Sequence, residues 1–540
     1  MRTNLRRLAA VAVTIPLLAL AACGGGQVRG PGNGAATSGA PAGTAAPGSD
    51  TFTVSFNLDI ITEWDPAVSY SNEIIAMANM YETLTYYDSV AKELQPRLAT
   101  EWSASDDGLT WTFKLREGVK FHTGRELDAT AAKEAIDRTI ELKSGAAYIW
   151  DAVDSIEATD ASTLVFKLKY AAPLDLVSSS AYAAHIYDTQ AAGSEDLGKW
   201  FEEGHDAGTG PYTAENWQPG AERELTMTAF DDYWGGWKDG QYKKIEFRVT
   251  PEVTTAWQLL QSGDVTWVER LSPTLIEQAA TTDGVAVSET PSFQNLLALP
   301  NTADGPLADP KVRQAVRLAI DTAGLTAALH GAVSEADGIV PPGLLGAGSG
   351  FKSTPNLDEA KSLLAEAGYG EGKPLELTLT YAQGDDDQQV FVTLLGSAIS
   401  QLGGKLNAVP MQWNAQWERA MTGEKQDIFV MYWYPDYADA YSWFANVFRS
   451  SEKPYFNLAY LDNADVDKLI DSLPALTATD PAKAEQTYHE LQQKLVVDLA
   501  AVYPLFVQNY QRAYRASVVG YVDNPAYPNV VFVHQLSHQG

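Results

Sequence analysis

Hydrophobic and polar residues alternate along two segments in the first third of the chain. Residues 109–115 and 162–170 both place apolar side chains at every second position, which is the period of a strand with one buried face. Between them, Asp128 or Thr130 is suited to cap a helix rich in alanine. This part of the chain is therefore expected to combine a sheet with a helix.

After residue 301 the pattern interleaves helices with strands. Pro310 suits the first position of a helix, and Val312, Val316 and Ile320 would share one face of it. Asn356 is placed to cap a second helix. Both segments therefore predict amphipathic helices that cover a sheet.

The strands of that sheet are also visible in the pattern. Residues 375–381 alternate as a strand, residues 391–402 have a helical period, and residues 427–434 (DIFVMYWY) form a continuous apolar run. Such a run is typical of a central strand that is buried on both faces. Strands that alternate with helices indicate an α/β fold.

Composition and charge narrow the possible classes of protein. The chain has 540 residues, 45% of them hydrophobic and 20% charged, with a formal net charge of −31. This length allows two or three domains, and the charge argues against binding to nucleic acid or to anionic lipid surfaces. We expect no membrane-spanning helix in the folded part, because the longest late apolar run, 495–507, is broken by Asp498 and Pro504.

The N-terminus has the pattern of a secretion signal. Arg2, Arg6 and Arg7 precede an uncharged apolar run over residues 8–22. At about 15 residues, the run is shorter than the roughly 20 that span a bilayer. Directly after it comes Cys23, the only cysteine of the chain, so an internal disulfide is excluded.

Residues 20–23 (LAAC) resemble the lipobox of bacterial lipoproteins. The resemblance implies a lipoprotein signal peptide over residues 1–22 and a lipid attached to Cys23; an ordinary signal with an idle cysteine is the alternative. Residues 23–50 consist mostly of Gly, Ala, Pro, Ser and Thr, a composition that forms a flexible tether.

Motifs of catalysis are missing. Residues 346–350 (GAGSG) put the serine one place late for a nucleophile elbow, and residues 367–374 (AGYGEGKP) depart from a phosphate loop at both ends. The seven histidines are scattered; only His534 and His538 lie within one helical turn, and these two are expected to be surface histidines. We expect no catalytic residue, no metal site and no cofactor, although a catalytic pair of carboxylates stays open.

Aromatic residues gather around the predicted strand 427–434. Trp413, Trp417, Trp433, Tyr434 and Tyr437 belong to this group. Some must pack in the core, but ligands of open α/β sheets bind beyond the carboxyl ends of strands, and this strand must end near Pro435. These five aromatic side chains are therefore candidate ligand contacts.

Six blocks of the chain together carry a family resemblance. They are residues 81–88, 98–138, 208–220, 230–236, 301–321 and 432–439. These blocks resemble the family 5 solute-binding proteins of ABC importers, the group of dipeptide-, oligopeptide- and nickel-binding proteins. They cover nearly the whole folded chain, in the order of the family.

The resemblance implies an α/β fold of the two-lobed, periplasmic-binding-protein-like type II class, with an extra subdomain inserted in the first lobe. Gly208, Gly210 and Pro211 would form a turn on the hinge side. The implied bounds are residues 51–89, 208–299 and 501–540 for lobe I, 90–207 for the inserted subdomain and 300–500 for lobe II.

The resemblance also implies a binding role for Asp436. In the peptide-binding members the matching aspartate pairs with the α-amino group of the ligand, and the residue matching Trp433 lines the pocket. Here Pro435 precedes Asp436, and Ala440 follows Asp439 where the family usually has proline, so this loop can aim its carboxylate differently. A plain turn-forming role for Asp436 is the alternative.

Together these observations predict a monomeric, lipid-anchored receptor on the extracytoplasmic face of the cell membrane, which is the periplasmic face where an outer membrane exists. It would hold a peptide between two lobes and present it to the permease of an ABC importer. An oligosaccharide stacked on aromatic faces is the second ligand class and a nickel complex the third. A secreted hydrolase is the alternative from another class of protein.

No cation is assigned to the carboxylate of the ligand. Arg419 and Arg449 are candidates because they lie near Asp436 in sequence.

Overall fold

The computed structural model describes residues 50–539 except 57–60, 62, 353 and 423–424. These residues fall in one compact unit that spans Thr44–Gly540. Cys23, the predicted signal peptide and nearly all of the predicted tether lie outside the described residues. Within the described part, no helix is both long and apolar enough to cross a membrane.

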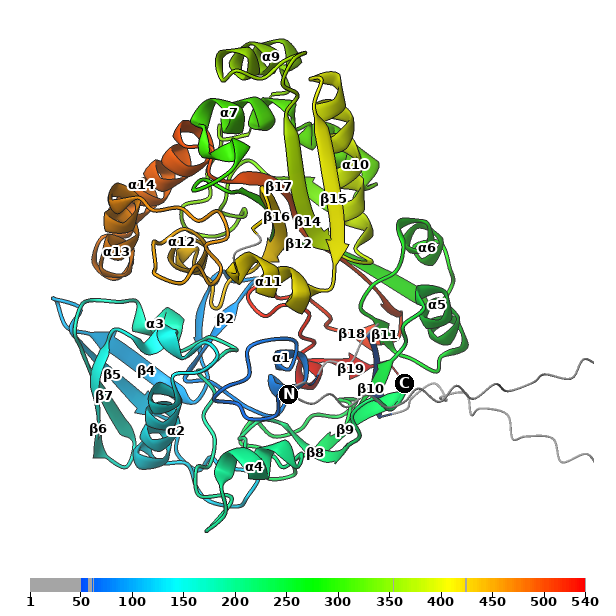
Figure 1. Cartoon of the computed structure of the whole chain (residues 1–540). Helices are drawn as coiled ribbons and strands as arrows, with labels where there is room; N and C mark the ends of the chain where they lie inside the picture. Colours follow the sequence, from blue (N-terminus) through cyan, green and yellow to red (C-terminus); the bar gives the residue numbers. More distant parts are fainter. Residues whose placement is uncertain (1–49, 57–60, 62, 353, 423–424, 540) are drawn as a thin grey trace, which may run out of the picture. The chain divides into compact units, whose positions relative to one another are not determined.

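One 11-stranded sheet runs through the structure (Figure 1). Its order is β15-β14-β16-β12-β17-β11-β1-β10-β9-β8, and β13 pairs with β17 at the side. Its strands are β1 (Thr51–Phe56), β8 (Tyr212–Trp217), β9 (Arg223–Ala229), β10 (Lys244–Val249), β11 (Trp267–Val268), β12 (Val285–Pro300), β13 (Val333–Glu335), β14 (Glu376–Ala382), β15 (Lys405–Met411), β16 (Ile428–Trp433) and β17 (Tyr503–Arg515).

Two long strands, β12 with 16 residues and β17 with 13 residues, join the two halves of this sheet. β16 pairs with β12 from Asn295 to Pro300, whereas β11 pairs with β17 at Ala513 and Tyr514. The register of β12 on β17 shifts between Pro291 and Asn295, which lies between these two contacts. Such an irregularity bends a strand locally, so the sheet can change direction here.

A separate four-stranded sheet has the order β4-β5-β7-β6. Its strands are β4 (Ala99–Ala104), β5 (Thr110–Leu115), β6 (Val153–Asp160) and β7 (Thr163–Leu168), and α2 (Ala129–Leu142) packs on it. The predicted strands and helix of this region are confirmed, and Asp128 caps α2 by accepting a hydrogen bond from the Ala131 N–H. The bounds of the inserted subdomain, 90–207, and of the two lobes stay a prediction.

Helices cover the half of the large sheet that contains β14, β15 and β16 (Figure 1). In α7, Val312 and Val316 are buried as predicted, and Ile320 is the buried residue that ends the helix. The helices are α7 (Pro310–Ala319), α8 (Thr322–Ala328), α9 (Leu357–Glu366), α10 (Asp386–Gln401), α11 (Trp413–Met421), α12 (Tyr441–Val447), α13 (Ala464–Thr479) and α14 (Pro481–Gln492).

The remaining elements are short. A hairpin of β2 (Thr85–Asp88) and β3 (Glu93–Pro96) follows α1 (Ile74–Met77), and β18 (Val518–Val519) pairs with β19 (Ser537–His538). The other helices are α3 (Leu174–Val177), α4 (Leu197–Glu202), α5 (Val253–Ser262) and α6 (Pro273–Ala279).

Gly208 and Gly210 allow close packing on Met80. A Cβ atom on Gly208 would lie 2.0 Å from the Met80 oxygen, and the Gly210 N–H donates to that oxygen at 2.8 Å. The hinge-side role of this turn stays a prediction. His534 and His538 are partly exposed, whereas the side chains of His122 and His185 are buried.

Candidate functional site

The candidate site begins where β16 ends. β16 is buried on both faces, and the chain turns away from the sheet at Pro435, so that Asp436 lies beyond the carboxyl end of a central strand. This is the position at which open α/β sheets bind ligands. Asp436 is 3% exposed.

The carboxylate of Asp436 is only half satisfied. The Tyr70 hydroxyl donates to its Oδ1 at 3.1 Å, whereas its Oδ2 is buried and has no hydrogen-bond partner among the described residues. Burial raises the pKa of Asp436 to about 7, and the hydrogen bond from Tyr70 opposes this rise. A buried carboxylate that lacks a partner is costly, so a cation from a ligand would be stabilised here.

Tyrosines from distant parts of the chain surround this carboxylate. The Tyr70 ring meets the Tyr182 ring edge-on with centroids 5.3 Å apart, and Tyr182 stacks on Tyr434 at 6.3 Å. Ser180 donates to the backbone oxygen of Asp436 at 2.7 Å. The site thus combines the loop after β16 with two segments that precede β8.

Asp439, three residues further, has a structural role. Its Oδ1 accepts hydrogen bonds from the Tyr488 hydroxyl and from the Tyr441 N–H, both at 2.7 Å. The first of these bonds holds the loop against α14. The two buried aspartates of this loop therefore differ in their hydrogen bonds. Asp439 is held by the protein, whereas Asp436 retains an oxygen without a partner among the described residues.

The predicted aromatic contacts divide into three groups. Tyr434, Tyr182 and Tyr70 form a group of contacting rings beside Asp436, which we call the tyrosine cluster. Trp433 and Trp417, in contrast, both contact the Phe456 ring. Tyr437 is buried in the same core cluster as Trp433. Trp413 is 44% exposed and packs on Phe429, so it is not brought together with the others.

Two cavities adjoin the tyrosine cluster. Tyr70 lines a cavity of about 200 Å³, together with Tyr148, Asn446, Phe456 and one cation, Arg449. Tyr510 lines a second cavity of about 500 Å³; its hydroxyl is buried without a described partner.

The larger cavity is polar and lies between the two halves of the sheet. It is lined by Glu269 and Arg270, which follow β11, by Arg512 on the shared strand β17, and by Asp387 at the start of α10. Arg270 and Asp387 form an ion pair across it at 3.1 Å. No group of three or more side chains suited to bind a metal ion occurs among the described residues.

Sequence reasoning did not identify Tyr70, Ser180, Tyr182 or Tyr510. Tyr70 and Asp436 are 366 positions apart, and no local pattern indicates such a contact. For Asp436 itself the sequence offered two signals, its position at the end of an apolar run and the family block over residues 432–439.

The chain matches the model of a known protein family. The model of "Bacterial extracellular solute-binding proteins, family 5 Middle" matches residues 93–455, about two thirds of the chain and all of β16 with the following loop. The chain belongs to this family.

Proteins from Escherichia coli, Helicobacter pylori and Brucella suis are similar to this family 5 protein. The probable D,D-dipeptide-binding periplasmic protein DdpA of E. coli (strain K12) is 27% identical over 485 residues, which are 88% of this chain and 92% of DdpA. DppA of H. pylori in complex with the peptide STSA has a TM-score of 0.76 and 22% identity, covering 91% of this chain and 98% of that one. NikA of B. suis in complex with Fe(III)-EDTA has a TM-score of 0.79 and 20% identity, covering 91% of this chain and 100% of that one.

These findings show the fold and the general activity. The structural similarities show the two-lobed α/β fold of family 5 periplasmic binding proteins. The family makes this chain an extracytoplasmic solute-binding component of ABC transport, which is not an enzyme.

Proposed function

We propose that this family 5 protein captures a peptide beside Asp436 and delivers it to the permease of an ABC importer. The observation that carries the proposal is the buried, unpartnered Oδ2 of Asp436. The α-amino group of a peptide is a cation with hydrogens to donate, and a charge-assisted hydrogen bond to this oxygen would satisfy both groups. The names of DdpA and of the peptide complex of DppA agree with this ligand class.

Arg449 is our candidate for the carboxylate of the ligand. Among the described residues that line the cavity of about 200 Å³ next to Tyr70, it is the one cation, and its present partner, Asp471, is half-exposed. An ion pair of this kind contributes little, so a ligand carboxylate can replace it. We further propose that Trp433, Tyr434, Tyr437 and Trp417 shape the apolar wall of the site, whereas the exposed Trp413 would contribute at most at its rim.

The first experiment compares peptide binding by the wild-type protein and by Asp436→Asn. Di- to pentapeptides are screened by thermal shift, and the best is titrated by calorimetry. A ligand at 100 times its dissociation constant stabilises the protein by about 2.7 kcal/mol. Loss of a buried charged partner costs about 2 kcal/mol or more, so we expect Asp436→Asn to weaken binding at least ~30-fold.

Asp232→Asn is the matched control, because Asp232 is exposed and pairs only with Lys120 at the surface; it should bind like the wild type. Equal affinity of Asp436→Asn and the wild type would show that the amine anchor lies elsewhere. Binding of oligosaccharides or of a nickel complex in the same screen, without peptide binding, would contradict the peptide assignment. Hydrolysis of the ligand would contradict a binding function.

We also propose that Cys23 carries a lipid that holds the protein at the extracytoplasmic face of the membrane, with residues 24–50 as tether. The support is the LAAC sequence at residues 20–23 after an apolar run. We expect Cys23→Ala to move the protein from the membrane fraction to the soluble fraction of its host cells, as seen by immunoblotting. Retention of the variant in the membrane fraction would contradict the anchor.

A further inference from the structure

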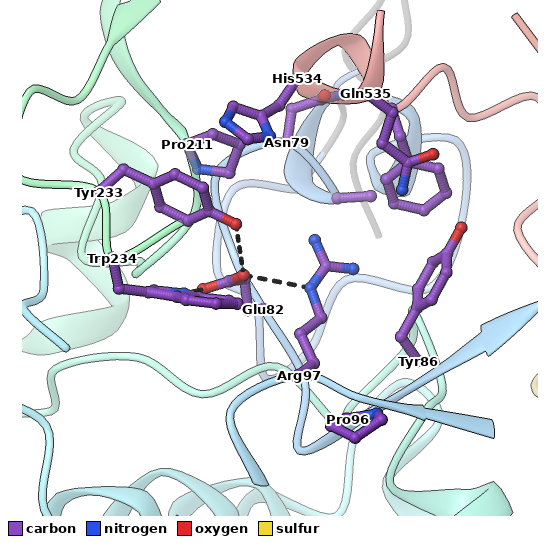
Figure 2. A pocket seen from close by; sticks show the side chains of 12 residues that line it. Asn79, Glu82, Tyr86, Pro96, Arg97, Pro211, Tyr233, Trp234, His534 and Gln535 are labelled. Atoms are coloured by element: carbon purple, nitrogen blue, oxygen red, sulfur yellow. Dashed lines mark hydrogen bonds and ion pairs between the residues drawn. The ribbon is translucent and has the colours of Figure 1, made fainter. Parts of the chain in front are cut away.

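A third cavity, of about 170 Å³, is lined by none of the residues that contact Asp436 (Figure 2). Four parts of the chain that are far apart in sequence form it. They are the stretch from Ala78 to Arg97, which includes the β2–β3 hairpin, Pro211 just before β8, the turn after β9 at Tyr233 and Trp234, and the C-terminal segment from Phe532 to Gln535. The proposed peptide site does not use this cavity.

A fully satisfied carboxylate forms one wall of the cavity. Glu82 is buried and accepts hydrogen bonds from Arg97 Nε at 3.2 Å, from the Tyr233 hydroxyl at 3.1 Å, from Trp234 Nε1 at 2.8 Å and from the Thr209 hydroxyl at 3.0 Å. Four donors on one carboxylate leave it little capacity for a ligand. Glu82 therefore holds the wall together.

Arg97 is only partly used by the protein. Within its guanidinium group, Nε is the one nitrogen with a hydrogen-bond partner among the described residues, and Figure 2 shows the two terminal nitrogens directed into the cavity. The side chain is 15% exposed. A guanidinium group with four N–H bonds free, at a largely desolvated position, favours an acceptor with two oxygen atoms.

Two aromatic rings flank this guanidinium group. Its carbon lies 5.3 Å from the centroid of the Tyr86 ring and 5.6 Å from that of the Phe532 ring. Arg116 stacks on Trp234 at 3.9 Å and adds positive charge behind the wall. Burial lowers the pKa of His534, so this neighbour adds no charge near neutral pH. The two rings therefore limit the space in which a ligand can approach the terminal nitrogens of Arg97.

From these contacts we infer that the cavity is a second binding site, for a small carboxylate anion. The planar carboxylate matches the two terminal nitrogens of Arg97 in a bidentate pair, and the volume has room for a small organic acid but not for a peptide. The inference is independent of the peptide site.

Acetate is the probe and acetamide, which has the same shape without the charge, is its control. Both are titrated into the full-length protein at constant ionic strength, and binding is followed by calorimetry and by tryptophan fluorescence, since Trp234 lines the cavity. We expect saturable binding of acetate and none of acetamide. Arg97→Lys keeps the charge beside Glu82 but lacks the bidentate edge, and should weaken acetate binding about tenfold.

Three further variants make the test decisive. Lys167→Gln removes an exposed positive charge that pairs with Glu157 elsewhere and should bind acetate normally, as should Asp436→Asn. If Arg97→Lys does not fold, the double variant Glu82→Gln, Arg97→Gln leaves no unpaired charge and should bind no acetate. The site is refuted if acetate does not bind saturably, or if its binding survives the change at Arg97 and is lost in Asp436→Asn.

Discussion

At the scale of single residues, Asp436 and Asp439 show how one loop assigns different tasks to identical side chains. Both are 3% exposed. Asp439 is fixed by Tyr488 and the backbone, and Asp436 keeps one oxygen without a partner. Sequence could point to Asp436 through a family block, but it could not show this difference, which depends on Tyr488 and Tyr70 from remote segments.

The unpartnered oxygen predicts a stability cost in the ligand-free protein. The pKa of Asp436 is about 7 in the folded protein, against 3.8 for a free aspartate. Between these values the folded state holds a proton that the unfolded state releases, so stability falls as pH rises from about 4 to 7 and is constant above. We expect Asp436→Asn to remove this fall and to stabilise the ligand-free protein at pH 8, by about 4 kcal/mol at most.

Thermal unfolding of both proteins at pH 4.5 and pH 8 checks this. The gain in melting temperature of Asp436→Asn should be larger at pH 8 than at pH 4.5. A variant less stable than the wild type at pH 8 would show that Asp436 has a compensating partner.

At the scale of elements, periodicity and capping predicted some of the strands and helices that the structure contains. The strands at 110–115, 163–168, 376–382 and 428–433 and the helices that begin after Asp128, Asp309 and Asn356 were all expected. The start of α10 at Asp386 was missed, because its first turn is polar; Asp385 caps it by accepting from the Gln388 N–H. The close approach of Gly210 to Met80 was also missed, since contact between distant segments has no local pattern.

The contact between Gly210 and Met80 predicts that an added methyl group destabilises the protein at Gly210 and not at an open glycine. A Cβ atom at Gly210 would lie 2.6 Å from the carbonyl carbon of Met80, and backbone there cannot move without disturbing the segment that leads to Glu82. We expect Gly210→Ala to destabilise the protein by about 2 kcal/mol or more. Gly370→Ala is the control, because nothing lies within 4 Å of its added atom. Chemical denaturation compares the two; equal midpoints would contradict the close packing.

At the scale of the whole molecule, the family resemblance predicted the two-lobed class of fold. It did not predict the order in which the strands of the large sheet pair. β12 and β17 look like ordinary strands in sequence, and only their pairing shows that they serve both halves. The bridge between Arg270 and Asp387 was equally invisible, as it spans 117 positions.

This ion pair predicts how the two halves sit when no ligand is present. Arg270 is half-exposed and Asp387 nearly buried, so the pair contributes about 0.2–1 kcal/mol to holding the two halves together. We expect Asp387→Asn and Arg270→Gln to shift the balance toward an open form by up to about fivefold, seen as a larger radius of gyration in small-angle X-ray scattering. Lys311→Gln, which breaks a surface pair with Glu366, should leave the radius unchanged. No increase in either test variant would contradict a closing role.

The shared strands also determine how this protein can be divided for laboratory use. A fragment that stops at residue 300 would lose β16 and β17, and so leave β12 with both edges unpaired. Open strand edges promote aggregation. Expression of either half alone should therefore give insoluble material, and a fluorescent reporter is better inserted in an exposed loop, such as that around Gly370, than placed at a cut between halves.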